Sequence, residues 1–404
     1  MQVQPIDTEY AFDPTDPSKS KDYGLLARIR RERGVVRPAE GVVISTRYAA
    51  TRQAFLDSKR FSSVGDMRAP GIVVPTEESF LGELDAPVHP RIRRILLQGF
   101  TRKRSRLAED WARASVRRRL EAFVSKGGGD IMQSLAIPLP GSVSAHELGI
   151  PDALHDRVMS WCDELLHSSW PATGKTERGE GIQGAFPEFA ECLDEMIRER
   201  AQPGAPDDLM GLMVNTVDPD GWQIGAHHCR TLMANILSGS LSASYMIGNL
   251  LYRLLSDEDF ASALRSDPKK VELSVDESLR FEAPVTFLFR TALEDAEIGG
   301  TPVYQGEHIM LSMAAANRDE EVWEHAEEFR LDREGSAEHL AFGFGPHVCL
   351  GNHLTRMIGR VVLEEVLQRF KPGELELAAD FEWVCVNHLQ EYGPETLDVV
   401  ITGA

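Results

Sequence analysis

The feature that most constrains this chain is a glycine-rich turn that carries a cysteine and runs directly into a helix. The stretch from His339 to Arg356 reads HLAFGFGPHVCLGNHLTR. After it, apolar residues recur at helical spacing until Pro372 ends the run. Cys349 is therefore expected at a helix N-terminus, where unpaired N–H groups and the helix dipole favour a thiolate over a thiol. The pattern predicts a metal-bound or nucleophilic cysteine.

Composition limits the class of protein. The chain has 404 residues, of which 42% are apolar, and no Pro/Ser/Gly-rich linker divides it, so we expect a single domain over residues 1–404. The net charge of −20 argues against nucleic acid as the main partner. Five cysteines, odd in number and far apart, favour a reducing compartment such as the cytoplasm over a disulfide framework. The N-terminal residues show no signal-peptide pattern.

One segment raises the question of a membrane. The 22 residues from Thr231 to Tyr252 carry no charge and are long enough to span a bilayer. They nevertheless include two asparagines and four serines, which hydrocarbon solvates poorly. We therefore expect a buried helix of a protein without a membrane span.

The order of the patterns along the chain predicts a mainly α fold with a small β region. Short β-type runs occupy the first sixty residues, with Gly41–Thr46 the clearest, and a helical pattern follows over Arg52–Arg60. Residues 91–125 are predicted as helix, and helical patterns continue as far as Arg280. Phe287–Ile309 is typical of short strands and turns, and residues 315–333 of an irregular meander.

The cysteine stretch resembles a known family signature. Written as Phe342-x-x-Gly345-x-His347-x-Cys349-x-Gly351, it is similar to the haem-binding motif of the cytochrome P450 family. The resemblance implies that Cys349 ligates the iron of haem b, while the glycines let the backbone turn closely beneath the porphyrin.

Two other interpretations of this stretch remain. One is a buried structural cysteine beside a glycine turn. The other is a zinc site made by His347, Cys349 and His353.

A second motif comes earlier in the chain. Glu277-x-x-Arg280, within DESLRF, resembles the helix-borne E-x-x-R pair of the same family, and Arg333 matches the meander arginine that locks this pair. The resemblance implies a buried three-member ion network. By itself, a Glu–Arg pair at this spacing is usually a solvated surface pair.

Basic residues complete the resemblance. His89 and Arg93 in APVHPRIRR, Arg290 in FLFRTA and His347 match positions that bind the two haem propionates in the family. Each alone also suits an ordinary surface cation. Together the matches span nearly the whole chain. They imply the cytochrome P450 fold, a single large helical domain with haem between a long central helix and the cysteine loop.

The central segment departs from the family pattern. The family carries small-Gly-x-acid-Thr above the iron, and the best alignment here gives Ser238-Gly239-Ser240-Leu241-Ser242. Gly239 leaves room for dioxygen, Leu241 replaces the acid and Ser242 replaces the threonine. A leucine relays no proton, so delivery would use Ser242, ordered water or the substrate. A second register places Ser244 at the alcohol position.

The resemblance implies an oxidase or monooxygenase that tailors a small hydrophobic or aromatic secondary metabolite. Because the acid is missing, oxidative C–C coupling of an aromatic cyclic dipeptide is an alternative to hydroxylation. A haem-binding sensor without catalysis is another. Substrate contacts are expected from the loop Ser63 to Gly82, from the tail His388 to Tyr392, and from an apolar wall of Val285, Phe287, Leu288 and Phe289, although core packing explains each of these residues equally well.

Electrons are expected from a separate ferredoxin and its ferredoxin reductase, since the chain is too short to add a flavin or nicotinamide domain to a haem domain. Eleven basic residues between Arg91 and Arg119 face only Glu109 and Asp110 within that stretch. Such a patch would attract an acidic ferredoxin, and the alternative is a solvated helix face.

Overall fold

The computed structural model describes residues 5–65, 68 and 72–402. Contacts divide the chain into two compact units. Unit 1 comprises residues 1–62, 112–137 and 242–404, and unit 2 comprises residues 63–111 and 138–241. Because the two sets of segments alternate along the chain, no single cut separates the units.

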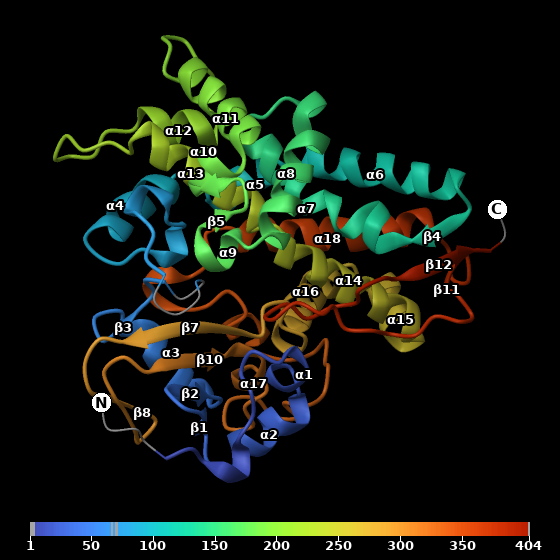
Figure 1. The fold of residues 1–404 in the computed structure, drawn as a ribbon. Helices are drawn as coiled ribbons and strands as arrows, with labels where there is room; N and C mark the ends of the chain where they lie inside the picture. The colour runs from blue at the N-terminus through green and yellow to red at the C-terminus, as the bar shows by residue number, and fades with distance from the viewer. Residues whose placement is uncertain (1–4, 66–67, 69–71, 403–404) are drawn as a thin grey trace. The chain divides into compact units, whose positions relative to one another are not determined.

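Unit 1 contains the main sheet, in which five strands lie in the order β1-β2-β10-β7-β3 (Figure 1). Strand β10 pairs with β2 in parallel and with β7 in antiparallel register. This arrangement confirms the predicted strands near Gly41–Thr46 and over Phe287–Ile309. The strands of unit 1 are β1 (Val35–Ala39), β2 (Val42–Ser45), β3 (Phe61–Ser62), β4 (Gly128–Asp130), β7 (Phe287–Ala292), β8 (Ala296–Ile298), β9 (Thr301–Val303), β10 (His308–Ser312), β11 (Leu375–Leu377) and β12 (Asp398–Ile401).

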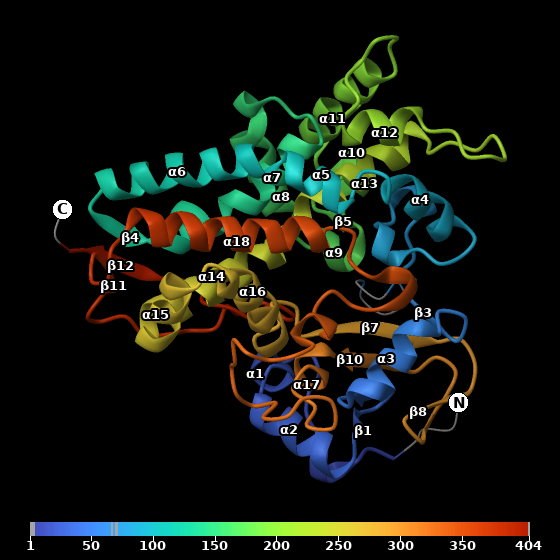
Figure 2. The same cartoon turned by 180° about the vertical axis from the view of Figure 1, so that it is seen from behind.

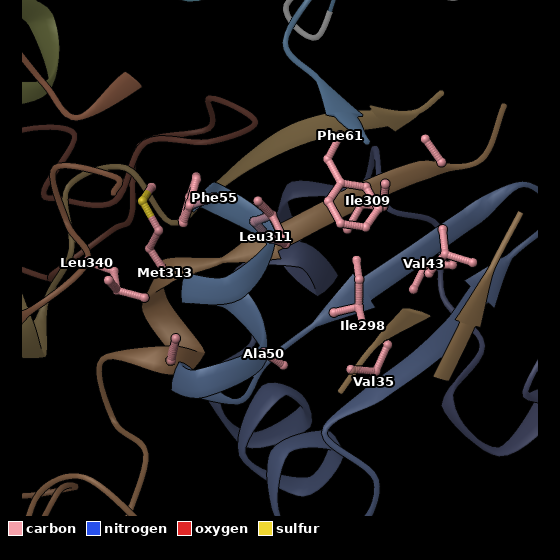
Figure 3. Close-up of a cluster of buried hydrophobic side chains, with 14 residues drawn as sticks. Val35, Val43, Ala50, Phe55, Phe61, Ile298, Ile309, Leu311, Met313 and Leu340 are labelled. Atoms are coloured by element: carbon pink, nitrogen blue, oxygen red, sulfur yellow. The ribbon is translucent and has the colours of Figure 1, made fainter. Parts of the chain in front are cut away.

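Alternating side chains of the sheet enter two apolar clusters. Ile309 and Leu311 of β10 pack with Val43, Phe55 and Phe61 on one face, as Figure 3 shows. Met310, between them in sequence, belongs to the second cluster. This period of two is what a strand with both faces buried requires.

Helices of unit 1 surround this sheet and extend beyond it. Helix α6 runs alongside α18 (Figure 2), where Arg113 and Arg117 pair with Glu365 at 2.7 and 2.6 Å. The helix predicted after Cys349 is α18, which ends before Pro372. The α-helices that lie wholly or mostly in unit 1 are α1 (Pro17–Ser20), α2 (Tyr23–Glu32), α3 (Tyr48–Leu56), α6 (Glu109–Ser125), α14 (Leu241–Ser256), α15 (Glu258–Ser266), α16 (Lys269–Phe281), α17 (Met313–Ala316) and α18 (Asn352–Arg369).

Two predicted helices have different bounds in the structure. The helix predicted over Arg52–Arg60 is α3, which ends at Leu56 because the Asp57 carboxylate accepts the Arg60 N–H at 3.2 Å and turns the chain. The single helix predicted over 91–125 is three helices. A new one starts after Thr101, whose hydroxyl caps it by accepting the Arg104 N–H.

The regular elements of unit 2 are mostly α-helices within its described residues, and its strands β5 (Lys175–Thr176) and β6 (Gly179–Glu180) form a small hairpin. Asp208 caps α12 by accepting the Gly211 N–H at 2.8 Å. The α-helices are α4 (Val88–Leu96), α5 (Arg102–Leu107), α7 (Pro138–Glu147), α8 (His155–His167), α9 (Trp170–Thr173), α10 (Gly181–Ala185), α11 (Pro187–Arg200), α12 (Leu209–Asn215) and α13 (Ala226–Ser238).

The uncharged segment is not one continuous helix, which corrects the prediction of a long central helix. Helix α13 ends at Ser238 and α14 begins at Leu241. Serine hydroxyls compete for helical carbonyls at the break, where Ser240 Oγ donates to Leu237 O at 2.6 Å. Within the ranges that the structure describes, no helix is long and apolar enough to cross a membrane.

Candidate functional site

The cysteine loop is a tight turn that glycine makes possible. Gly343 and Gly345 have φ of +67° and +71°, a region that favours glycine. A Cβ on Gly345 would lie 2.8 Å from the main-chain oxygen of Phe55, so a side chain there would displace the loop from α3. The Cys349 N–H donates to Phe342 O at 2.8 Å and closes the turn.

Cys349 differs from the other cysteines. All five lie within the described residues and none forms a disulfide; Cys349 is exposed, whereas Cys162 and Cys229 are buried. Burial raises the pKa of both Cys162 and Cys229 to about 12, so neither is a ready thiolate. Cys349 lies just before Gly351, the N-cap residue of α18, where the helix dipole favours an anion. The interpretation as a buried structural cysteine is therefore wrong.

The three residues of the predicted ion network lie in contact. Glu277 accepts from Arg280 at 2.8 Å and from Arg333 at 3.0 Å. Their side chains are 1%, 0% and 5% exposed, so this is not a solvated surface pair. The guanidinium groups also donate to meander carbonyls, including Glu328 O, to which both arginines donate. The network therefore joins α16 to the meander.

Sequence analysis overlooked a second group of charged and polar residues. Asp276 precedes Glu277 on α16 but contacts His339 and Arg356 instead. His339 and Arg356 are the first and last residues of the cysteine stretch quoted above, but the motif Phe342 to Gly351 does not include them. Only tertiary structure reveals that Asp276 belongs with them.

The predicted propionate-binding residues divide between the two units. In unit 1, Arg290 is 3% exposed on β7, and His347 is half-buried in the cysteine loop. In unit 2, His89 is 4% exposed and Arg93 half-buried, one helical turn apart on α4. Their joint contact with one cofactor stays a prediction.

The residues aligned with the family's proton-delivery motif differ in burial. Leu241 and Ser242 are half-buried at the start of α14. Ser244 is 1% exposed, and its hydroxyl donates to Ile137 O at 3.3 Å. Gly239 ends α13 with ordinary helical φ, and a Cβ there would lie 2.9 Å from Asn235 O.

The predicted apolar wall alternates along β7. Phe287 is fully buried in the second cluster and packs against Phe289, which leaves it no surface for a ligand. Val285 and Leu288 pack against the opposite cluster and are only partly buried. A Cβ on Gly343 would lie 3.9 Å from Leu288, so this side chain lies beside the cysteine loop.

The tail loop, defined here as residues 386–391, is held by a lysine from the other end of the sequence. Lys21 Nζ donates to the carbonyl oxygens of Val386, His388 and Glu391 at 2.7, 2.7 and 2.9 Å. On the neighbouring helix α14, the hydroxyl of Tyr245 lies 3.2 Å from His388 Nδ1.

Part of the predicted substrate loop from Ser63 to Gly82, residues 66–67 and 69–71, lies outside the described residues. Its described end is bound to α13 within unit 2. Thr231 Oγ1 donates to Glu77 O at 2.7 Å, and Leu81 N–H donates to Asn235 Oδ1 at 3.2 Å.

Several basic residues of the predicted patch are ion-paired. Arg91 lies 2.7 Å from Asp218, Arg104 lies 3.7 Å from Asp207, and Arg113 and Arg117 pair on α18. This pairing removes part of the field that the sequence predicts. On the short helix α5, Lys103 and Arg106 are exposed.

The alternative zinc site gains no support from the geometry. Among the described residues, no group of three or more His, Cys, Asp or Glu side chains is arranged to hold a metal ion.

Comparisons with known proteins agree on one family. Residues 256–377 match the family described as cytochrome P450. A steroid C26-monooxygenase of Mycolicibacterium smegmatis is 30% identical over 93% of this chain and 91% of its own. The cytochrome P450 monooxygenase PikC of Streptomyces venezuelae is 31% identical over 93% and 90%.

Solved structures agree in fold. A post-tailoring hydroxylase involved in himastatin biosynthesis has a TM-score of 0.80 at 27% identity, covering 96% of this chain and 100% of that one. The relatives named as monooxygenases favour an enzyme over a haem-binding sensor without catalysis.

Proposed function

The chain belongs to the cytochrome P450 family of haem enzymes, and from that premise we propose that it is a monooxygenase that tailors a small hydrophobic or aromatic secondary metabolite, with electrons from a separate ferredoxin and ferredoxin reductase. The observation that carries this proposal is the exposed thiol of Cys349, set in a glycine turn at the start of α18.

Haem b is the cofactor of the family, and the residues of the cysteine loop fit it. An exposed sulfur just before a helix N-terminus, in a loop turned by two positive-φ glycines, suits a thiolate ligand of haem iron. When bound, haem supplies the activation of dioxygen, and thiolate donation favours O–O cleavage. Cys349 would hold the iron, with Phe342 and Gly351 shaping the loop.

The basic residues have a separate role in this proposal. Arg290 and His347 from unit 1, with His89 and Arg93 from unit 2, would bind the two propionates. Guanidinium and imidazole donors suit paired carboxylates such as the propionates.

Proton delivery is assigned to Ser242 rather than Ser244. Ser242 is half-buried at the start of α14, whereas Ser244 is only 1% exposed. Leu241 supplies no acid, so Ser242 would pass protons together with ordered water. Gly239 would leave space for dioxygen.

Two observations support a small hydrophobic or aromatic substrate: the names of relatives and the partly buried apolar side chains of the predicted wall. The relatives' names include a steroid monooxygenase and a post-tailoring hydroxylase. Val285, Leu288 and Phe289 are only partly buried and would contact an apolar substrate. Oxidative C–C coupling of an aromatic cyclic dipeptide remains the second candidate, because Leu241 supplies no acid and a coupling substrate would supply hydrogen atoms from its own phenol or indole groups.

Spectroscopy and product analysis test the proposal together. The reduced carbon monoxide adduct should show a thiolate-type Soret band, and candidate ligands should then be screened for spin-state shifts. With a surrogate ferredoxin system, monooxygenation gives a product with one added oxygen atom, and coupling gives one that has lost two hydrogen atoms. A protein that binds no porphyrin would contradict the proposal.

The ferredoxin partner has its own test. If the exposed cations of α5 steer an acidic ferredoxin, its second-order rate of haem reduction should fall as salt rises. The double reversal Lys103→Glu/Arg106→Glu should slow reduction about tenfold at low salt, the lower end of steering effects. Lys269→Glu/Lys270→Glu, on α16, is the matched control. A rate that is independent of salt would contradict steering.

A further inference from the structure

The mostly buried carboxylate of Asp276 contacts the side chains of both Arg356 and His339. Its Oδ1 accepts from Arg356 Nε at 2.7 Å and lies 3.3 Å from His339 Nε2. The Asp276 side chain is 16% exposed, and His339 is 0% exposed. The neighbouring network of Glu277 uses other partners, so the two carboxylates on α16 serve separate sets of residues.

The first arm leads from Asp276 to the carbonyl of Cys349. Arg356, fixed by Asp276, donates from a guanidinium nitrogen to Asn352 Oδ1 at 3.3 Å. The amide nitrogen of Asn352 then donates to Cys349 O at 2.8 Å. The Asn352 side-chain oxygen accepts from Arg356 and its nitrogen donates to Cys349 O, so the bond from Arg356 orients the amide with its nitrogen toward Cys349.

The second arm leads through Phe342 to the N–H of Cys349. The Arg356 guanidinium lies 4.7 Å from the centroid of the Phe342 ring, and the ring of His339 lies 5.5 Å from it. Both partners of this ring are therefore held by Asp276. The carbonyl of Phe342 accepts the Cys349 N–H at 2.8 Å.

Hydrogen bonding fixes the tautomer of His339. Its Nδ1 accepts the main-chain N–H of Ala341 at 3.2 Å, so the ring proton is on Nε2 and points to Asp276. Burial lowers the pKa of His339, which keeps the imidazole neutral. Burial alone would raise the pKa of Asp276, but the hydrogen bond from His339 and the charge of Arg356 outweigh it, so the pKa is lowered.

We infer that Asp276 is a positioning residue for the Cys349 sulfur, acting through Arg356 and Asn352 on the carbonyl of Cys349 and through Phe342 on its N–H. The inference rests on the proposed function, in which Cys349 holds the haem iron. Both main-chain groups that flank the Cys349 Cα are thereby tied to one carboxylate, which limits where the sulfur lies. Groups that orient a metal ligand in this way commonly change metal affinity or activity about 10–100-fold when removed.

Three variants test the inference in the haem-loaded protein. Asp276→Ala removes the acceptor of both arms, Asp276→Asn keeps an oxygen acceptor at lower charge, and Asn352→Ala breaks the first arm alone. The measurements are the rate of haem transfer to excess apomyoglobin and the fraction of the reduced carbon monoxide adduct that shows the thiolate-type band. Glu272→Gln, an exposed carboxylate on the same helix, is the matched control.

Asp276→Ala should raise the haem transfer rate about tenfold and lower the thiolate-type fraction, with Asn352→Ala weaker in the same direction. Asp276→Asn should restore most of the wild-type behaviour. The alanine double variant should show less than the product of the two single effects, because both changes act on one arm. If Asp276→Ala does not fold, Asn352→Ala decides alone.

Wild-type haem transfer and an unchanged band in Asn352→Ala and Asp276→Ala would overturn the inference. So would a lower melting temperature with both haem measurements unchanged, since that indicates a purely structural role. A wild-type protein without a thiolate-type band would overturn the proposed function and the inference together, whereas a normal wild-type band with unaffected variants overturns the inference alone.

Discussion

The cysteine loop and the junction between α13 and α14 are built in opposite ways. The loop is tied to α16 through Asp276 and its partners, and both main-chain groups of Cys349 have partners. The junction has local serine bonds, such as that from Ser240 to Leu237 O. No acid stands where the family has one.

The difference indicates where the proposed enzyme depends on distant contacts. Under the proposed function, the position of the sulfur relies on side chains of α16 and α18, so single changes there should alter haem binding. At the junction, the bond from Ser240 to Leu237 O is local. There we expect the outcome of the reaction to depend on the Ser242 hydroxyl and on the substrate.

The largest expected effect is at the ligand itself. Cys349→Ser should remove the thiolate-type band completely, because an alkoxide or alcohol does not replace a thiolate as iron ligand. The spectrum of the reduced carbon monoxide adduct measures this, and Cys385→Ser is the control at a half-buried free thiol. An unaltered thiolate-type band in Cys349→Ser would show that the cysteine loop does not supply the iron ligand.

The next effect concerns the ion network that joins α16 to the meander before the loop. Glu277→Gln should lower the free energy of unfolding by about 3–5 kcal/mol, since it leaves two buried guanidinium groups without their carboxylate. Denaturant titration measures the loss. Asp332→Asn, which breaks the exposed pair with Arg330, should produce no measurable change. Equal effects of the two variants would mean that burial does not strengthen the network.

A smaller effect is expected at the junction. Ser242→Ala should lower product formed per electron pair consumed about tenfold, less than the ~10²-fold minimum for a dedicated proton-transfer group, because water can substitute. Ser244→Ala should leave this ratio unchanged, since its hydroxyl already donates to Ile137 O. The reverse result would assign the alcohol role to Ser244.

The smallest effect is a pH dependence of the loop. The lowered pKa of Asp276 means that its contribution to stability is complete above the ordinary aspartate pKa and is lost as pH falls through the lowered value. His339 and Arg356 are the groups that face this carboxylate. The difference in denaturant stability between wild type and Asp276→Asn should therefore shrink as pH falls below the ordinary range of aspartate. The effect of Ser242→Ala should stay constant over that range.

Sequence alone predicts the cysteine loop well because its signals are local. Positive-φ glycines, a cysteine and a following amphipathic helix lie within one short stretch, and the strands of the sheet alternate visibly. The break between α13 and α14 was missed, because Gly239 and the flanking serines are compatible with either a bend or a continued helix.

The contacts of distant residues were harder to predict. Phe287 was expected to contact substrate, but it is buried in the apolar cluster that contains Met310. The sequence does not show which face of β7 this cluster covers. Asp276 and Glu277 look alike in sequence, and only the packing of α16 against α18 gives them different partners. The ion pairs of Arg113 and Arg117 depend on the packing of α6 against α18, which also joins residues far apart in sequence.

The ammonium group of Lys21 has a practical consequence for handling this enzyme. Three carbonyl dipoles of the tail loop point at one positive charge contributed from near the start of the polypeptide. Deleting the N-terminal residues up to and including this lysine would leave the three carbonyl oxygens without their shared donor, and the tail loop would lose its present conformation. An N-terminal truncation that removes Lys21 would therefore disturb the tail loop near the C-terminus.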